Sequence, residues 1–460
     1  MNNSVKKQNK FISYFGENVD VKREFIAGMT SFLAMAYIIA VNPSILSATG
    51  MDAGALVTAT CLSAAFACIL MGVYAKLPFG LAAGMGLNAF FAFSVVIGKG
   101  VSYETALTAV FVEGIIFILL SLFKVREAVV NSIPLNLKYA VTGGIGIFIA
   151  FIGFSGSGMV TSNKDTLVQL GNFFSPTVLI TMLGIIIIAV LEKKKVKGSL
   201  LWGIVGATLV AWIYAYFNRE AAAAMNIFLP NGIFKFESLA PIAGKIDFSF
   251  LGSAENILNF AIIVLTFLFV DFFDTIGTLV GVSSRANMLD KDGNIPNVGK
   301  ALMVDAIGTT VGALMGTSTV TTFVESAAGV EEGGRTGLTA VVIGGFFLVA
   351  MFFSPIFVAI PSCATAPALI YVGYLMMGSI LKIDFSEITE ALPAFLIITL
   401  MPLTYSIGDG LTIGVLTYVA LNIVNNIFGK EKKKISVAML ILAIVFLFKL
   451  AMPLIEQMIL

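Results

Sequence analysis

The chain has 460 residues, of which 58% are hydrophobic and only 12% are charged, and its mean hydropathy is +0.97. A soluble domain carries about 25% charged residues, so 28 basic and 27 acidic side chains are too few to cover a water-soluble surface of this size. The composition therefore indicates a protein embedded in a lipid bilayer, and the net charge of +1 gives no sign of a nucleic-acid partner.

Histidine is absent, which excludes Ser-His hydrolases, histidine metal sites and proton relays through histidine. The three cysteines, Cys61, Cys68 and Cys363, lie in apolar runs without CxxC spacing, so neither disulfides nor a thiolate metal site is expected. We therefore expect no metal and no cofactor.

Fourteen apolar segments are long enough, at about 20 residues each, to be read as crossings of a bilayer core, although two of them are short and broken. In chain order they cover residues 25–45, 53–74, 79–97, 104–123, 138–156, 174–191, 198–217, 254–281, 299–317, 318–330, 337–355, 361–381, 389–405 and 407–427. A further apolar stretch, 435–456, is interrupted by Lys449 and Glu456, so the sequence leaves open whether it crosses the bilayer or lies at the interface.

Basic residues predict the orientation of these spans. They precede the first span and follow the fourth, sixth, eighth and fourteenth, so all of them fall on one side, together with the N-terminus. The positive-inside rule makes this side cytoplasmic, and we expect a multi-pass protein of the cytoplasmic membrane. The longest polar segment, 218–253, then lies outside and separates seven spans from seven.

Seven spans in each half give the halves opposite orientations, which is the inverted repeat of many secondary transporters. The pairs Ile133-Pro134 and Ile360-Pro361 open the fifth and twelfth spans, which are equivalent in such a repeat. The third and tenth spans are also equivalent, and small residues interrupt both. Matched interrupted spans indicate a binding site near the middle of the membrane. The alternative is that these glycines only allow helices to pack closely.

Carboxylates inside the bilayer cost about 2.5–3.5 kcal/mol each on insertion scales, so each needs a reason. Asp271 and Asp274 lie one turn apart on the eighth span, Glu325 lies in the tenth and Asn88 in the third. Carboxylates accept N–H donors and an amide both donates and accepts, so this cluster predicts a site for a flat polar solute. The flanking phenylalanines that could stack on its ring are Phe90, Phe91, Phe272, Phe273 and Phe323.

Other interpretations of these polar residues stay open. The acids could instead cap helix ends or pair internally, and this applies most to Asp274, beside Thr275. Glu113 fits helix packing better than proton transfer. Asp305, near the start of the ninth span, is expected to reach water by snorkelling. Asp409 is expected at a helix junction that faces the site.

Three segments, 84–91, 271–278 and 317–337, resemble in this order the adenine/guanine/hypoxanthine permeases, the purine branch of the nucleobase–cation symporter-2 superfamily. The similarity extends from about Tyr14 to Phe428. It implies an all-α polytopic protein with fourteen spans in a seven-plus-seven inverted repeat, in which spans 3 and 10 form short strands. The implied divisions are an N-terminal tail (1–24), a core domain (25–123 and 254–355), a gate domain (124–217 and 356–428), an extracellular linker (218–253) and a hydrophobic C-terminal tail (429–460).

The resemblance also implies roles for individual residues. The family's substrate-binding acids fall on Asp271 and Glu325 and its asparagine on Asn88, and we add three neighbours as substrate contacts: Phe272, Phe323 and Ser326. Proton coupling is expected at Glu325, Asp271 and Asp274, because no histidine is present. The further candidates are Asp409, Thr275 and Phe90.

The expected function is secondary active uptake of hypoxanthine, guanine and adenine by an elevator or rocking mechanism. The uracil and xanthine branches carry a histidine one turn after the acid of span 8, and its absence argues against those substrates. We expect H⁺ rather than Na⁺ as the coupling cation, although the sequence leaves Na⁺ open, and the resemblance also implies a homodimer. An anion transporter or channel with this fold is the alternative, but it would need a basic or neutral residue in place of Glu325. An enzyme is not expected, because no nucleophile and base come together.

Overall fold

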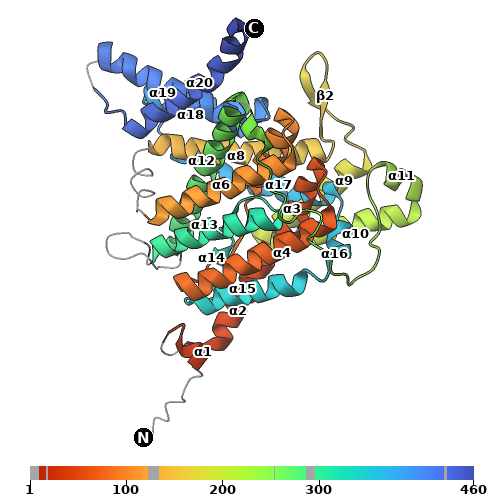
Figure 1. The fold of residues 1–460 in the computed structure, drawn as a ribbon. Coiled ribbons are helices and arrows are strands. Elements are labelled where there is room, and N and C mark those ends of the chain that lie inside the picture. Colours follow the sequence, from red (N-terminus) through yellow and green to blue (C-terminus); the bar gives the residue numbers. More distant parts are fainter. Residues whose placement is uncertain are drawn as a thin grey trace, which may run out of the picture.

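The computed structural model describes residues 10–16, 19–122, 134–252, 254–285, 288, 295, 297–428 and 432–459. Within these ranges the chain is mostly helical (Figure 1). The longer helices are α2 (Val21–Met35), α3 (Ile38–Leu46), α4 (Ala53–Leu70), α6 (Tyr103–Leu122), α8 (Leu135–Gly156), α9 (Pro176–Lys193), α10 (Ser199–Phe217), α12 (Ala254–Arg285), α13 (Val298–Met315), α15 (Gly337–Ala350), α17 (Ser362–Met377), α18 (Ile388–Leu403), α19 (Ile407–Phe428) and α20 (Val437–Ile459).

Shorter elements connect these helices. The short helices are α1 (Lys10–Ser13), α5 (Met85–Ala89), α11 (Arg219–Ala224), α14 (Ser326–Glu331) and α16 (Ser354–Val358), with wider turns η2 (Met71–Ala75) and η3 (Phe90–Ile97) and tighter turns η1 (Ser47–Thr49), η4 (Ser249–Gly252) and η5 (Ile380–Lys382). The strands form two antiparallel pairs, β1 (Leu81–Ala83) with β4 (Val320–Thr322) and β2 (Val160–Asn163) with β3 (Leu167–Leu170).

Local sequence explains where several helices begin. Asp20 and Asp52 precede α2 and α4, and their side chains accept hydrogen bonds from backbone N–H groups of the first turn. Ser175 caps α9 in the same way, directly before a proline at the first helical position. Such caps satisfy N–H groups that have no partner within the helix, which matters more in a bilayer, where water is absent.

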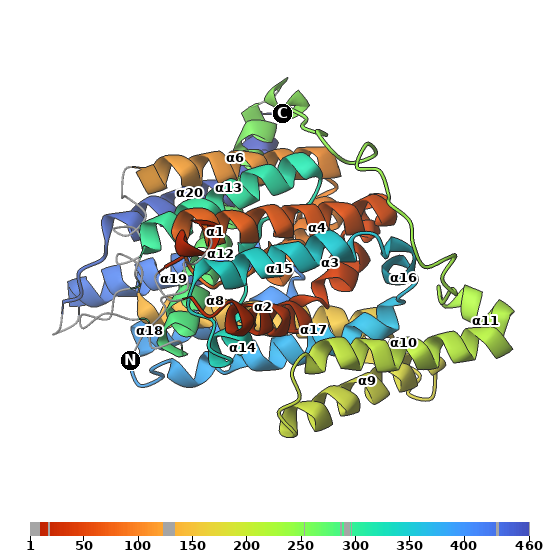
Figure 2. The same cartoon turned by 90° about the horizontal axis from the view of Figure 1, so that it is seen from below.

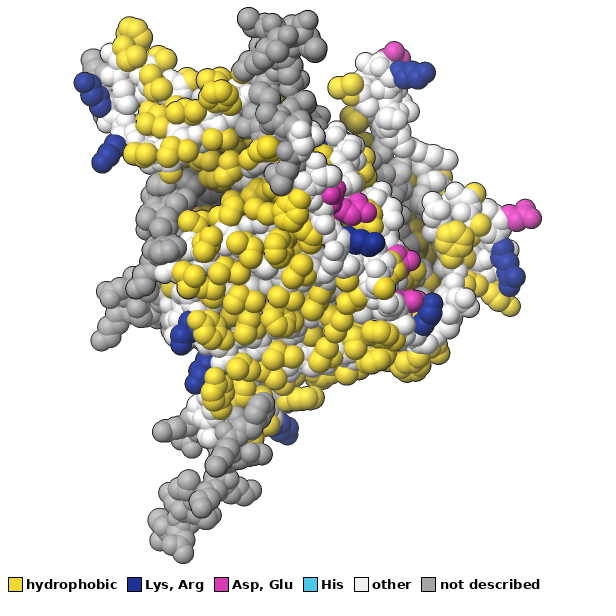
Figure 3. Space-filling view, viewed as in Figure 1, with side chains coloured by type: hydrophobic (Ala, Val, Ile, Leu, Met, Phe, Trp, Pro, Cys, Tyr) yellow, Lys and Arg dark blue, Asp and Glu magenta, His cyan; other side chains and the backbone are white. Residues whose placement is uncertain are grey.

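The helices have the length and composition of membrane spans. In the part of the chain that the structure describes, nine helices are long and apolar enough to cross a membrane, and shorter apolar helices include α15 and α18. Figure 3 shows a broad, continuous area of apolar side chains, with charged side chains bordering it on both sides. Each of the fourteen predicted segments coincides with a helix or a strand–helix element. The prediction of a mostly helical polytopic membrane protein is therefore confirmed.

Two elements lie outside the predicted spans. The hairpin of β2 and β3 follows α8, where no strand is predicted from the sequence, and all four residues of β3 are exposed. The apolar stretch after α19 forms the helix α20, which packs against α19 and α12.

The packing divides the helices into two groups. In the first, α4 packs against α3, α13 and α15, while α2 packs against α14 and α15, and α6 against α13 and α12. In Figures 1 and 2, α6, α13, α4 and α15 run side by side as a layer. In the second group α8 packs along α17 and α18, α18 packs along α19, and α9 and α10 pack together and against α17. Sparser contacts between the groups join α5 and α12 to α8, and α3 to α17.

Glycines allow the close contact between α8 and α17. A Cβ atom added to Gly146 would lie 2.8 Å from the backbone oxygen of Gly373, and one added to Gly373 would lie 2.4 Å from the backbone oxygen of Gly146. Each glycine therefore meets the backbone of the other helix, as small residues do at tight helix contacts in membranes. The helices also begin alike, because Pro134 and Pro361 occupy their N-cap positions.

Candidate functional site

The two interrupted segments, 79–97 and 318–330, meet through the antiparallel pair of β1 and β4. Ala82 lies opposite Thr321, and two further backbone bonds extend the pair, from Gly84 N to Thr319 O (3.0 Å) and from Phe323 N to Gly80 O (2.9 Å). These bonds satisfy backbone groups that an interrupted helix leaves without partners, which is why irregular backbone is tolerated here. The helix α5 starts directly after β1, and α14 starts four residues after β4.

A run of hydroxyl side chains in and before β4, which we name the hydroxyl segment (residues 317–322), ties this strand to the surrounding helices. Its members bond polar side chains on different helices: Thr317 accepts from Asn42 of α3, Ser318 donates to Asn88 of α5, Thr319 donates to Glu113 of α6, and Thr321 bonds Thr275 of α12. Hydrogen bonds between helices satisfy polar groups that would be costly in hydrocarbon. The segment thus collects polar groups from four helices around one strand.

Asp271 lies in a fully buried cluster with Thr275. The Thr275 hydroxyl oxygen is 3.2 Å from Asp271 Oδ1, 3.0 Å from Asp305 Oδ2 and 2.8 Å from Thr321 Oγ1. Thr275 thus lies within hydrogen-bond distance of two carboxyl groups from different helices, α12 and α13, and its single hydroxyl hydrogen can be donated to only one of them at a time. The structure thereby brings together the predicted residues Asp271 and Thr275 and adds Asp305 to them.

The expectation that Asp305 reaches water is wrong, because its side chain is completely buried and bonds Thr275. Snorkelling requires a long, flexible side chain, and the short aspartate side chain on α13 instead points to α12. Glu113 is also completely buried, and it accepts a hydrogen bond of 3.0 Å from Thr319. This contact between α6 and the hydroxyl segment agrees with the packing role predicted for Glu113.

Glu325 occupies the N-cap position of α14 and is bonded to the first span. Tyr37 donates its hydroxyl hydrogen to Glu325 Oε1 over 2.7 Å. Tyr37 lies in the turn between α2 and α3, and its side chain is completely buried. Asp274, half-buried on α12, also approaches the strand pair, because a Cβ atom added to Gly84 would lie 3.8 Å from Asp274 Oδ2. Three carboxyl groups, from α12, α13 and the start of α14, therefore lie around the pair of β1 and β4.

Asn88 is completely buried on α5, directly after the strand pair. Its Oδ1 accepts a hydrogen bond from Ser318, whereas its Nδ2 has no hydrogen-bond partner among the described residues. Buried amide donors are almost always paired in native proteins, and a partnerless one needs an explanation. A ligand that offers an acceptor would supply it.

Of the other residues predicted to contact substrate, some lie beside Glu325 and others pack against phenylalanines. Ser326 is buried and accepts a 2.8 Å hydrogen bond from Gly80 N, so it holds α14 to β1. Phe323 lies 6.4 Å from the Tyr37 ring, between centroids, beside Glu325. Phe272 instead stacks on a phenylalanine of α6, and Phe90 meets Phe267 edge to face at 4.8 Å. The Phe273 side chain lies outside the described residues.

Asp409 lies in the first turn of α19 and is half-buried. The position is a helix junction, as expected, where α18 ends and α19 begins. A Cβ atom added to the neighbouring Gly408 would lie 3.7 Å from the Phe90 ring, so this junction approaches the helix that carries Asn88. The described residues contain no group of three or more Cys, Asp or Glu side chains placed to hold a metal ion.

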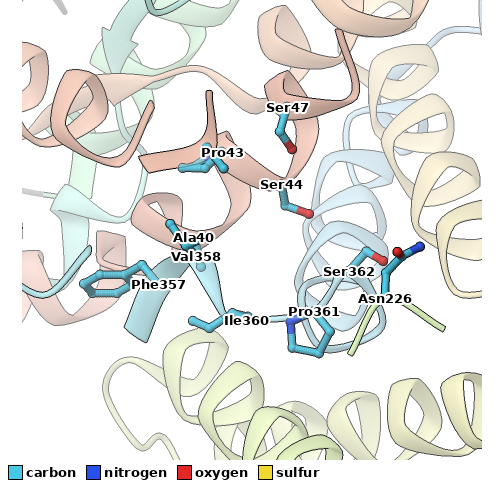
Figure 4. Close-up of a pocket in the computed structure, with 11 residues that line it drawn as sticks. Ala40, Pro43, Ser44, Ser47, Asn226, Phe357, Val358, Ile360, Pro361 and Ser362 are labelled. Atoms are coloured by element: carbon cyan, nitrogen blue, oxygen red, sulfur yellow. The ribbon is translucent and has the colours of Figure 1, made fainter. Parts of the chain in front are cut away.

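A separate pocket of about 220 Å³ opens between α3, α16 and the start of α17 (Figure 4). Its polar lining consists of Ser44, Ser47, Ser362 and Asn226, and none of the predicted site residues belongs to it. Ser44 also lies 3.3 Å from the hydroxyl of Thr365, which links α3 to α17. The pocket therefore lies where the two packing groups meet.

Sequence reasoning missed Tyr37 and the hydroxyl segment as parts of this region. The run Thr-Ser-Thr-Val-Thr-Thr at 317–322 was a usable signal, since six consecutive residues with five hydroxyls are unusual in a membrane span. Tyr37 gave no such signal, because a single tyrosine in an apolar span is ordinary.

The comparisons with known proteins agree on the family. The model of a family described as "Permease family" matches residues 22–413. The chain is 42% identical to adenine permease AdeQ of Escherichia coli, over 86% of each chain. It is 41% identical to guanine/hypoxanthine permease PbuO of Bacillus subtilis, over 87% of this chain and 91% of the relative.

The fold also has a solved counterpart. The transmembrane domain of the cyanobacterial bicarbonate transporter BicA matches with a TM-score of 0.64 over 87% of this chain and 99% of that domain. The identity is only 17%, so this likeness concerns the fold alone. The sequence relatives confirm the resemblance drawn from the motifs and do not favour an anion transporter. The chain therefore belongs to the permease family, as a multi-pass membrane transporter rather than an enzyme.

Proposed function

We propose that the protein takes up purine nucleobases, namely hypoxanthine, guanine and adenine, across the cytoplasmic membrane. The permeases of Escherichia coli and Bacillus subtilis that it resembles carry adenine and guanine/hypoxanthine in their names. The observation that carries the proposal is the completely buried Asn88, whose Nδ2 has no partner among the described residues, in the same region as buried carboxylates. A purine edge offers both N–H donors and ring-nitrogen or carbonyl acceptors, and this set of groups complements it.

In this proposal each polar group has one task. The carboxylates of Glu325 and Asp271 accept N–H donors of the base, while Asn88 Nδ2 donates to a ring nitrogen or a carbonyl. Phe323, beside Glu325, offers a ring face, and Ser326 keeps the junction of β1 and α14 in place. Phe272 and Phe90, which pack on other phenylalanines, then shape the wall behind the base.

Asn88→Ala should weaken purine recognition without loss of protein from the membrane. The substitution removes the donor and leaves the acceptor of the bound base unpaired, which costs about 1–3 kcal/mol and raises KM by about 5- to 150-fold. The measurement is uptake of labelled hypoxanthine in competition with unlabelled adenine, guanine and uracil. An unchanged KM and competition profile would remove Asn88 from the site.

We further propose that uptake is coupled to protons through Glu325, Asp271 and Asp274. Without histidine, carboxyl groups are the side chains able to exchange protons in such a cavity. A carboxyl group that alternates between an apolar cavity and water can take up a proton in one state and release it in the other. Sodium coupling is the competing proposal, in which the same oxygens would serve as cation ligands.

The proposed architecture is a seven-plus-seven inverted repeat in which all fourteen segments cross the membrane. Three features support it: the antiparallel pairing of β1 with β4, the reciprocal glycine contact of α8 with α17, and the prolines that cap both of these helices. The division of the helices into two packing groups supports the proposed core domain (25–123 and 254–355) and gate domain (124–217 and 356–428). The distribution of basic residues supports a cytoplasmic N-terminus, and the family resemblance a homodimer.

Alternating access then requires the core to move against the gate, by an elevator or a rocking motion. Contacts between the two groups must break and form again in each cycle. One such contact is Tyr405, between α18 and α19, whose ring meets Phe93 of η3 and Phe148 of α8 edge to face at 5.8 and 5.5 Å. Its carbonyl accepts a 3.2 Å hydrogen bond from Ser94. This contact lies about one turn beyond Phe90 on η3 (Phe90–Ile97), and the proposal requires it to break when the core moves against the gate.

A further inference from the structure

The turn that interrupts the first span places Tyr37 against the proposed site. The helix α2 ends at Met35 and α3 begins at Ile38, so Tyr37 lies between two helical segments. Its side chain has no exposed surface, and its hydroxyl lies 2.7 Å from Glu325 Oε1. A second contact joins the same elements, because Ser31 of α2 donates to the backbone oxygen of Ser326 over 3.3 Å. The interrupted first span therefore reaches the start of α14 through two hydrogen bonds.

A packing role would explain why an aromatic ring stands at position 37, but not why its hydroxyl is bonded to a carboxylate. The ring lies 6.4 Å from that of Phe323, at an angle of 42°, and a phenylalanine would fill this space equally well. A buried phenol needs one hydrogen-bond partner, which any backbone carbonyl can supply. A carboxylate is a far more expensive partner to bury than a carbonyl. The simplest explanation is that the role of the Tyr37 hydroxyl is to bond the Glu325 carboxylate.

The Tyr37 hydroxyl donates to one carboxylate oxygen of Glu325, Oε1, and thereby restricts the orientation of the whole carboxylate. A charge-assisted hydrogen bond to Oε1 removes rotational freedom from a side chain that otherwise has several rotamers. Oε2 takes no part in the bond with Tyr37. The carboxylate is thus held in one orientation before any ligand arrives, and a ligand that binds it does not have to bear that ordering cost.

We propose that Tyr37 is a positioning residue for substrate binding, whose hydroxyl fixes Oε1 of Glu325 so that Oε2 receives an N–H donor of the nucleobase. This inference rests on the proposed function, in which Glu325 contacts the purine. It extends the site to the first span, which none of the predicted site residues occupies. It also predicts an effect on affinity rather than on the rate of the transport cycle, because Tyr37 acts on the orientation of a binding group.

The test compares Tyr37→Phe with Tyr418→Phe. Tyr418 is also a buried tyrosine, 5% exposed, but it lies on α19 in the second packing group, so it controls for the general effect of losing a buried hydroxyl. For each variant, the KM and Vmax of labelled hypoxanthine uptake are measured at equal amounts of protein in the membrane, together with the Tm of the purified protein. We expect Tyr37→Phe to raise KM about tenfold, with Vmax within about twofold of wild type, and Tyr418→Phe to leave KM unchanged.

The outcomes separate the inference from the proposed function. If wild-type protein takes up no purine, the proposed function fails and the role of Tyr37 fails with it. If wild type transports purines and Tyr37→Phe has the wild-type KM, the inference is overturned while the function stands. A lower Tm with unchanged KM would assign the hydroxyl to packing, and a fall in Vmax alone would assign it to the transport cycle, so either result also overturns it.

Discussion

Glu325→Gln should reduce purine uptake by about 100-fold or more while the protein remains folded in the membrane, because a neutral amide replaces a charged acceptor and a proton-binding group at once. Glu325 is half-buried at the start of α14, where Tyr37 bonds its Oε1. Glutamine keeps the size of the side chain and can still accept from Tyr37, so the fold should tolerate it. The measurement is the initial rate of labelled hypoxanthine uptake, normalised to the amount of protein in the membrane.

Glu331→Gln is the matched control, since Glu331 ends the same short helix but is exposed. Its uptake should stay within about twofold of wild type, as expected for a surface substitution. Wild-type uptake by Glu325→Gln would exclude this carboxylate from both binding and coupling. Equal losses in both variants would instead indicate damage to α14 as a whole.

A disulfide between the two packing groups should stop transport completely and reversibly. The hydroxyls of Ser44 on α3 and Thr365 on α17 are 3.3 Å apart, so the double variant Ser44→Cys/Thr365→Cys places two thiols within bonding reach. If the groups move against each other in every cycle, the bond holds the protein in one state. Uptake should be near wild type under reducing conditions, almost absent after oxidation, and restored by dithiothreitol.

The natural cysteines are all buried, yet Cys363 lies two residues from Thr365, so the double variant is made in a Cys363→Ser background. Each single cysteine variant in that background should keep its uptake after oxidation. Cross-linking is confirmed by mass spectrometry of the linked peptides. Full uptake by protein that is completely cross-linked would rule out relative motion of α3 and α17 during transport.

The sequence was sufficient to predict the positions of the apolar helices because their signal is local. Runs of apolar residues and interrupting glycines predicted both the helices and the special character of residues 79–97 and 318–330, which form the paired strand–helix elements. The pairing itself depends on contacts between residues more than 230 positions apart, such as Ala82 and Thr321, and hydropathy does not contain that information.

The polar region was harder to predict from the sequence, because its contacts also join residues that are far apart in the chain. The cost of charge in a bilayer identified Asp271 and Glu325 as residues that need partners, but it did not identify the partners. The apolar run that begins at 299 favours an exposed position for Asp305, but Asp305 lies two turns into α13, and its side chain is buried against Thr275 of another helix. Tyr37 becomes part of the region only because the turn after α2 brings it to Glu325.

The most direct test of the central claim is the uptake of labelled hypoxanthine, guanine, adenine and uracil by cells that lack their own nucleobase transporters and express this protein. Each uptake is measured at external pH 8 and pH 6, with and without a protonophore, and in sodium-free medium. We expect uptake of at least one purine but not of uracil, and an increase as the pH falls from about 8 to 6, because the lower pH supplies the coupling proton. This uptake should collapse with the protonophore and persist without sodium. Uptake of uracil alone would contradict the assignment to purines, and purine uptake that requires sodium and ignores the protonophore would contradict proton coupling.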